Sequence, residues 1–285
     1  MDRLSEEENW AALSGVGRRA LLGGGAAALG YALAARPVMA TAVTTPADGL
    51  VAGRVEVPAG DIRMTAYRAR PEGRARAPVL LVVPEIFGLH AWIEDVTRRF
   101  ARAGYYAIAP DPFQRQGDPT TVADTKTLVS TIISKVPDAQ VMADLDHALA
   151  FAGADGGDRA RASVTGFCWG GRITWLYAVH NPRLKAGVAW YGRLTGPTND
   201  LQTSQPIGLV DRLRVPVLGL YGTRDKGIPV SDVEAMNDAL KAARSKSTIR
   251  LFDADHGFLA DYRPSYDARA AGAAWNDALG WLGRF

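Results

Sequence analysis

The chain is poor in the residues that build disulfides and metal sites. Its 285 residues include one cysteine, Cys168, and four histidines. A single cysteine excludes an intrachain disulfide framework and any zinc site built on several thiolates. The histidines show neither an HExxH pattern nor a paired ligand spacing. We therefore expect no metal ion in this protein.

An excess of one charge and long apolar runs are also missing. The formal net charge is +3, and the arginines are scattered without a basic block, which argues against nucleic acid as the main partner. No G-x-G-x-x-G opens the first strand–helix unit and no phosphate loop is present, so we expect no organic cofactor. The apolar run of residues 20–35 is too short and weak for a stable transmembrane helix, which needs about 20 consecutive apolar residues.

Residues 1–42 differ from the rest of the chain. Arg18 and Arg19 precede the Gly/Ala-rich run, and an A-x-A-like end follows at residues 40–42. This order is typical of an export signal and resembles a twin-arginine signal. Such signals serve chains that are exported already folded, which suits a large domain with no disulfide. We predict that this segment is removed and that the protein is periplasmic or secreted. Three glutamates in the leader favour the alternative, an uncleaved cytoplasmic tail.

From residue 43 onward, short apolar runs alternate with helical patterns. Two edge strands are predicted at 53–59 and 62–69. Further strands are predicted at 78–87, 105–113, 162–167, 186–192, 215–222 and 247–253. Helices are predicted at 92–104, 138–154, 172–180, 230–243 and from about residue 265. This alternation predicts one α/β domain over residues 43–285, with a mostly parallel sheet of about eight strands and helices on both faces.

The connection at residues 193–213 is too long and irregular for a tight turn. Its sequence, RLTGPTNDLQTSQPIGLVDRL, shows neither helical nor strand periodicity over its whole length. Long connections of this kind are often functional, so it is a candidate lid or substrate-facing loop.

The cysteine lies in the stretch Gly166-Phe167-Cys168-Trp169-Gly170. This stretch fits the G-x-S-x-G nucleophile elbow, with cysteine in place of serine. A nucleophile at a strained turn crowds the neighbouring backbone, so the positions two before and two after it must be small. The helix that begins near Gly170 directs the positive end of its dipole at the sulfur, which favours the reactive thiolate. The alternative is a small buried core residue.

Asp225 and His256 follow two later strands in the order expected after such an elbow. Each lies just past the carboxyl end of a predicted strand, where catalytic groups gather in open α/β sheets. Histidine can take the thiol proton and deliver it to the leaving alkoxide, while aspartate fixes the tautomer of the imidazole. Asp253 and Asp255 compete as the acid because they lie beside the histidine in sequence.

The motifs PEIFGL, PDPF, GFCWGG, YGTRDKGIP and DADHGF together resemble the dienelactone hydrolase (carboxymethylenebutenolidase) family of α/β-hydrolases, over about residues 52–285. The resemblance implies the α/β-hydrolase fold and a carboxylic ester hydrolase with Cys168, Asp225 and His256 as its triad. It also implies that Glu85 lies beside the thiol and helps to control its protonation. In the sequence itself, a glutamate that closes an apolar run is unusual, because a buried carboxylate needs a partner.

Backbone and side-chain groups around the elbow complete the predicted site. The N–H groups of Trp169 and Ile86 are the expected oxyanion hole. In the dienelactone enzymes arginines hold a substrate carboxylate, and the resemblance implies this role for Arg115. The histidine loop departs from the family pattern, and Arg263, further along, is the candidate substitute. Tyr191 is a candidate lining residue of the pocket.

The sequence therefore predicts hydrolysis of a small carboxylic ester or lactone through an acyl-thioester intermediate. The expected partner is a small molecule, with no stable membrane anchor after processing. The alternative is a non-catalytic member of the same fold that binds a small ligand. A thiol redox protein is disfavoured, because the chain has no resolving cysteine.

Overall fold

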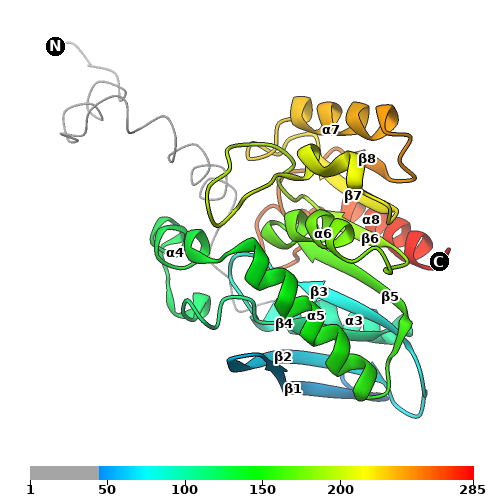
Figure 1. Cartoon of the computed structure of the whole chain (residues 1–285). Helices are drawn as coiled ribbons and strands as arrows, with labels where there is room; N and C mark the ends of the chain where they lie inside the picture. The colour runs from blue at the N-terminus through cyan, green and yellow to red at the C-terminus, as the bar shows by residue number, and fades with distance from the viewer. Residues whose placement is uncertain (1–44) are drawn as a thin grey trace.

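One sheet of eight strands runs through the computed structural model, which describes residues 45–285 (Figure 1). The strand order is β1-β2-β4-β3-β5-β6-β7-β8. The strands are β1 (Leu50–Ala59), β2 (Ile62–Pro71), β3 (Pro78–Val83), β4 (Tyr106–Pro110), β5 (Asp158–Phe167), β6 (Gly187–Trp190), β7 (Val217–Gly222) and β8 (Thr248–Phe252). The predicted α/β class and strand number are confirmed, while the predicted signal at residues 1–42 lies outside the described residues.

The sheet is antiparallel at one edge and parallel elsewhere. β1 and β2 form an antiparallel hairpin, and β2 pairs antiparallel with β4. All pairs from β4 through β8 are parallel. Every residue of β4, β6 and β7 is buried, because parallel strands are covered by helices on both faces.

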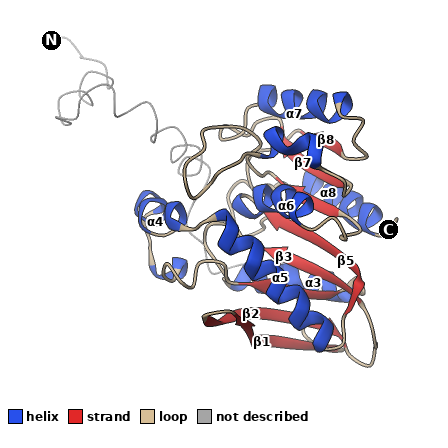
Figure 2. Cartoon of the chain, viewed as in Figure 1, coloured by secondary structure: helices blue, strands red, loops and turns tan. Residues whose placement is uncertain are grey.

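Helices cover both faces of the sheet. They are α3 (Ala91–Arg102), α4 (Thr125–Thr131), α5 (Asp138–Ala154), α6 (Trp169–His180), α7 (Val230–Ala242) and α8 (Ala268–Leu282). Figure 2 shows α5 and α6 in front of the sheet and α3 and α8 behind it. The rings of Phe100 and Trp275 pack 4.5 Å apart and join α3 to α8. Within residues 45–285, none of the helices has the length and apolar character needed to cross a membrane.

Several predicted boundaries differ from the structure for local reasons. The strand predicted at 78–87 ends at Val83, since the proline at 84 cannot donate to the sheet ladder. Glu85 therefore lies on the loop after β3, and not on the strand itself. The sequence pattern did not predict the short helix α4, because only two of its seven residues, Leu128 and Val129, are apolar. Its start depends on Asp124, which accepts a hydrogen bond from the N–H of Thr127 at 2.7 Å.

The segment 193–213 is fixed to α6 by a buried arginine. Arg172 donates to the carbonyl of Ser204 at 2.6 Å and to the side chain of Gln205 at 2.9 Å, and it pairs with Asp138 at 2.7 Å. The segment also forms a 3₁₀ helix at Pro206–Arg212. Its role as a lid stays a prediction, and its described conformation is a packed one.

Two glycines give a matched test of the packing around α6. A Cβ on Gly170 would lie 2.3 Å from the carbonyl oxygen of Val83, whereas a Cβ on Gly272 of α8 meets nothing within 4 Å. We expect Gly170→Ala to lower the free energy of unfolding by about 1–3 kcal/mol. Gly272→Ala is expected to raise it by about 0.5–1 kcal/mol, because alanine loses less backbone entropy on folding. Urea titrations measure both, and equal changes would contradict the packing described.

Candidate active site

Cys168 occupies a strained turn between β5 and α6. Its φ of 55° and ψ of −114° lie in a region that residues with side chains rarely adopt. Gly166 allows the turn to be tight, because a Cβ there would lie 2.2 Å from the carbonyl oxygen of Gly170. The N–H of Cys168 donates to the carbonyl of Trp190 at 3.0 Å. The turn therefore has the geometry expected of a nucleophile elbow.

His256 and Asp225 meet at the carboxyl ends of β7 and β8. The Nδ1–H of His256 donates to Oδ2 of Asp225 at 2.7 Å, and both side chains are buried. The other carboxylate oxygen accepts the N–H groups of Gly227 and Ile228 at 2.8 and 3.1 Å. Asp225 is thus fixed by the backbone, and it fixes the imidazole with Nε2 directed away from it.

The imidazole of His256 and the thiol of Cys168 are neighbours. Burial lowers the pKa of His256, but Asp225 and Cys168 together outweigh it and raise that pKa to about 10. Although a hydrogen bond with the thiol contributes to this shift, Nε2 has no partner of ordinary hydrogen-bond geometry among residues 45–285. The two side chains are therefore in close electrostatic contact, and the imidazolium is the favoured form of His256.

The two aspartates that compete with Asp225 in sequence lie elsewhere. Asp253 is 83% exposed and pairs with Arg224, and Asp255 lies 3.6 Å from the same guanidinium. Among the three candidates, Asp225 is the one that the structure joins to His256.

Buried hydrogen-bond donors surround the carboxylate of Glu85. Its Oε1 accepts a hydrogen bond from Nη2 of Arg263 at 2.8 Å, and its Oε2 accepts one from the hydroxyl of Tyr262. The Nε2 of His90 lies 3.5 Å from the same Oε2. Burial raises the pKa of Glu85, but Arg263, His90 and Tyr262 outweigh it and hold the pKa at about 2. Glu85 is therefore a carboxylate at neutral pH, fully removed from solvent.

Arg263 reaches the site as the partner of Glu85. Its Nε donates to the hydroxyl of Tyr262 at 3.0 Å, and its side chain is 2% exposed. Gly257 makes room for it, because a Cβ at that position would lie 3.0 Å from Cδ of Arg263. A glycine follows the histidine in this chain because a side chain at position 257 would crowd Arg263. The proposed role of Arg263 in holding substrate competes with its pairing to Glu85.

Arg115 belongs to a different cluster. Its Nη1 pairs with Asp144 of α5 at 2.9 Å, and its Nη2 with Asp61 at 2.9 Å and with the carbonyl of Ala59 at 2.9 Å. Its Nε also faces Asp61, at 3.1 Å. Each guanidinium nitrogen is therefore bonded within the protein. In the structure Arg115 thus links the β1–β2 turn to α5, and its expected role as the anchor of a substrate carboxylate, which would compete with these bonds, stays a prediction.

Three further predicted residues surround the elbow. Trp169 is the first residue of α6, so its N–H has no acceptor within the helix. Ile86 follows the end of β3, and the close packing of Gly170 on Val83 brings this segment beside α6. Tyr191 has a φ of 37°, and its ring centroid lies 5.1 Å from that of His256. The oxyanion-hole role of the two N–H groups stays a prediction.

Several buried polar side-chain atoms near Cys168 and Glu85 lack a hydrogen-bond partner within the described residues. Within the part of the chain that the structure describes, buried side-chain atoms with no hydrogen-bond partner include Nε2 of His256, the hydroxyl of Tyr191, Nε1 of Trp169 and both ring nitrogens of His90. Buried polar groups are normally paired, so these atoms are available to bond a ligand, although unpaired buried atoms also occur elsewhere, as at Arg70 and Trp281.

His90 and Tyr262 are the residues that the sequence did not reveal. Tyr262 lies on the loop before α8, and His90 is the N-cap residue of α3. Neither belongs to a motif of the elbow, the acid or the histidine. Only their three-dimensional contact with Glu85 identifies them.

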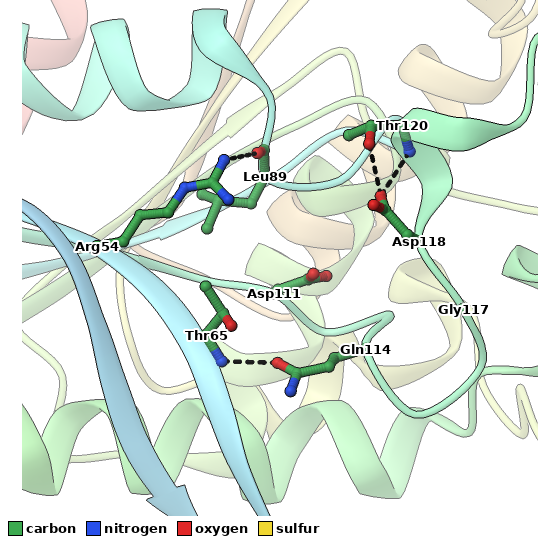
Figure 3. Close-up of a pocket in the computed structure, with 8 residues that line it drawn as sticks. All are labelled: Arg54, Thr65, Leu89, Asp111, Gln114, Gly117, Asp118 and Thr120. Atoms are coloured by element: carbon green, nitrogen blue, oxygen red, sulfur yellow. Dashed lines mark hydrogen bonds between the residues drawn. The ribbon is translucent and has the colours of Figure 1, made fainter.

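A separate polar pocket of about 370 Å³ opens at the carboxyl end of β4 (Figure 3). It is lined by Arg54, Thr65, Leu89, Asp111, Gln114, Gly117, Asp118 and Thr120. Burial raises the pKa of Asp111 to about 6.

No group of three His, Cys, Asp or Glu side chains within residues 45–285 is arranged to hold a metal ion.

Comparison of the sequence with known proteins shows the family of this chain. Residues 64–285 match the model of the dienelactone hydrolase family. The chain is 50% identical over 258 residues to a protein of Escherichia coli K12 named "Putative carboxymethylenebutenolidase", covering 90% of this chain and 95% of that one. A protein of the same name from Methylorubrum extorquens is 50% identical over 261 residues, covering 90% of each chain.

Solved structures agree with this relationship. The crystal structure of a "Putative Dienelactone Hydrolase" from Klebsiella pneumoniae is 48% identical, with a TM-score of 0.82, and the match covers 84% of this chain and all of that one. A dienelactone hydrolase-like promiscuous phosphotriesterase, P91, is 24% identical with a TM-score of 0.69, over 83% of this chain and 98% of that one, and shows the fold alone. With an eight-stranded sheet, a family match over most of its length and relatives at about half identity, this chain belongs to the dienelactone hydrolase family and is a hydrolase of the α/β-hydrolase fold.

Proposed function

We propose that the chain hydrolyses a small carboxylic ester or lactone, with Cys168 as the nucleophile, His256 as the proton carrier and Asp225 as the group that orients it. The observation that carries this proposal is the bond from Nδ1 of His256 to Asp225 at 2.7 Å, which leaves Nε2 beside the thiol of a strained turn. An ester is the substrate class that suits a thiolate, a paired imidazolium and backbone donors.

The proposed reaction has two halves. The thiolate of Cys168 adds to the substrate carbonyl, and the carbon–oxygen bond then breaks as His256 gives its proton to the leaving alkoxide. In the second half, His256 takes a proton from water, and the resulting hydroxide adds to the thioester. The carbon–sulfur bond breaks, which releases the acid and restores the thiolate. The N–H groups of Trp169 and Ile86 are proposed to stabilise the oxyanion in both halves.

The pairing at His256 supports its part in this sequence. With a pKa of about 10, the imidazolium is the prevailing form before substrate arrives, so a proton is available for the leaving group. Tyr191 is proposed to contact substrate, because its unbonded hydroxyl and its ring lie next to this imidazole.

Replacement of the nucleophile tests the proposal directly. We expect Cys168→Ala to abolish hydrolysis of p-nitrophenyl acetate while the circular dichroism spectrum and melting temperature stay close to those of the wild type. Mass spectrometry of the wild-type protein mixed with a slowly hydrolysed ester is expected to detect one acyl group. Retained turnover in Cys168→Ala would refute the role of the thiol, and an acyl group found on another residue would refute the thioester.

The Asp225–His256 pair predicts a pH dependence of stability. Because the folded-state pKa of His256 is raised from 6.5 to about 10, its contribution to stability is complete below about pH 6.5 and is lost as the pH rises through about 10. Asp225→Asn is expected to flatten this part of the profile and to lower kcat by about 10³ to 10⁴. Urea unfolding between pH 6 and 10 measures the first effect, and the same slope in both proteins would contradict it.

Export of the chain is a separate proposal, resting on the twin-arginine-like leader alone. Fractionation of cells that express the whole chain is expected to recover a periplasmic form that begins near residue 43. Replacement of Arg18 and Arg19 by lysine is expected to block this processing. A full-length protein that stays in the cytoplasm in both cases would contradict export.

A further inference from the structure

His90 is a buried histidine next to Glu85 that the proposed reaction does not use. Its side chain is 6% exposed, and its Nε2 lies 3.5 Å from Oε2 of Glu85. Neither ring nitrogen has a hydrogen-bond partner within residues 45–285. A buried polar group without a partner destabilises a fold, so its presence requires an explanation.

The rest of the environment of His90 is aromatic. Its ring centroid lies 5.4 Å from that of Tyr262, 6.2 Å from that of Phe87 and 6.4 Å from that of Trp92. An apolar side chain would fill this space without leaving a nitrogen unbonded. Packing therefore gives no reason for a histidine here, whereas the carboxylate of Glu85 does.

Glu85 has two close donors and one distant donor. Tyr262 bonds Oε2, and Arg263 bonds Oε1 at 2.8 Å. His90 faces the same oxygen as Tyr262, but its 3.5 Å separation exceeds the 2.7–3.2 Å of an ordinary N–H···O bond. A small movement of either side chain would close this gap. His90 is therefore placed as a second donor for an oxygen that Tyr262 now occupies.

The orientation of Glu85 matters to the sulfur. Burial has the largest effect on both groups: it lowers the pKa of Arg263 and raises that of Tyr191. The charges of Glu85 and Cys168 raise both pKa values, so the carboxylate and the thiol share these two neighbours. His256 is a further titratable neighbour of the thiol. A carboxylate that turned from Arg263 toward the sulfur would bring two negative charges together and disfavour the thiolate.

We propose that His90 is a positioning residue of this site, a reserve donor that keeps Glu85 on the side of Arg263 and away from Cys168. When the hydroxyl of Tyr262 moves, the Nε2–H of His90 closes on Oε2, and the buried carboxylate keeps two donors. A neutral imidazole with its hydrogen on Nε2 suffices, so the exchange transfers no proton. The inference rests on the proposed role of Cys168, and it does not depend on which ester is the substrate.

Alkylation of the thiol by iodoacetamide tests this inference without any substrate. Because the chain has one cysteine, the rate of labelling against pH reports the thiolate of Cys168 alone. We expect His90→Leu to move the midpoint of this profile upward by about one pH unit, while the melting temperature stays level or rises. His90→Asn, which retains a donor, is expected to stay close to the wild type. His147→Leu is the control, since this histidine of α5 also has a buried, unbonded Nδ1.

A second substitution shows whether His90 acts through Glu85. Tyr262→Phe removes the other donor on Oε2, so the double variant with His90→Leu is expected to shift the midpoint by more than the sum of the single shifts. His90→Phe replaces His90→Leu if the latter fails to fold. An unchanged midpoint, an equal shift in His147→Leu or strictly additive shifts would overturn the inference. Loss of ester turnover in the wild type, with the alkylation shifts intact, would overturn the proposed substrate class and leave the role of His90 standing.

Discussion

The close approach between the first turn of α6 and the end of β3 is the constraint on which the site depends. Gly170 has no side chain, and its backbone lies against the carbonyl groups of Val83 and Pro84. This contact sets the helix that begins after Cys168 beside the loop that carries Glu85 and brings the two edges of the site together. A side chain at the glycine would push them apart.

Two buried ion pairs then define the electrostatics near the sulfur. Asp225 with His256 and Glu85 with Arg263 each remove opposite charges from water together. Taking charge out of water is costly unless every lone pair and proton finds a partner, and both carboxylates here accept further hydrogen bonds. Stability and reactivity are therefore tied, because the loss of one partner leaves the other charge buried and uncompensated.

The sequence predicted the sheet and the main helices well because their signals are local. Period-two and helical patterns located nearly all elements, and α5 was predicted with its observed bounds. The elbow and the Asp225–His256 pair were predictable because order along the chain and strand ends fix them. The ion pairs of Arg115 were not predictable, since its partners Asp61 and Asp144 lie 54 and 29 residues away along the chain. The roles of His90 and Tyr262 were also not predictable, because only the folded chain brings them to the carboxylate of Glu85.

The anchoring of the segment 193–213 has a consequence for how a molecule enters. To lift that segment, the buried guanidinium of Arg172 would have to part from Ser204 and Gln205 at once. The guanidinium would keep its pair with Asp138, but two hydrogen bonds of a buried cation would be lost together, so an opening of this segment carries a free-energy cost. Because Cys168 is itself fully buried, a molecule can reach the sulfur only if covering side chains move, and Arg172 sets how much of that movement residues 193–213 can supply.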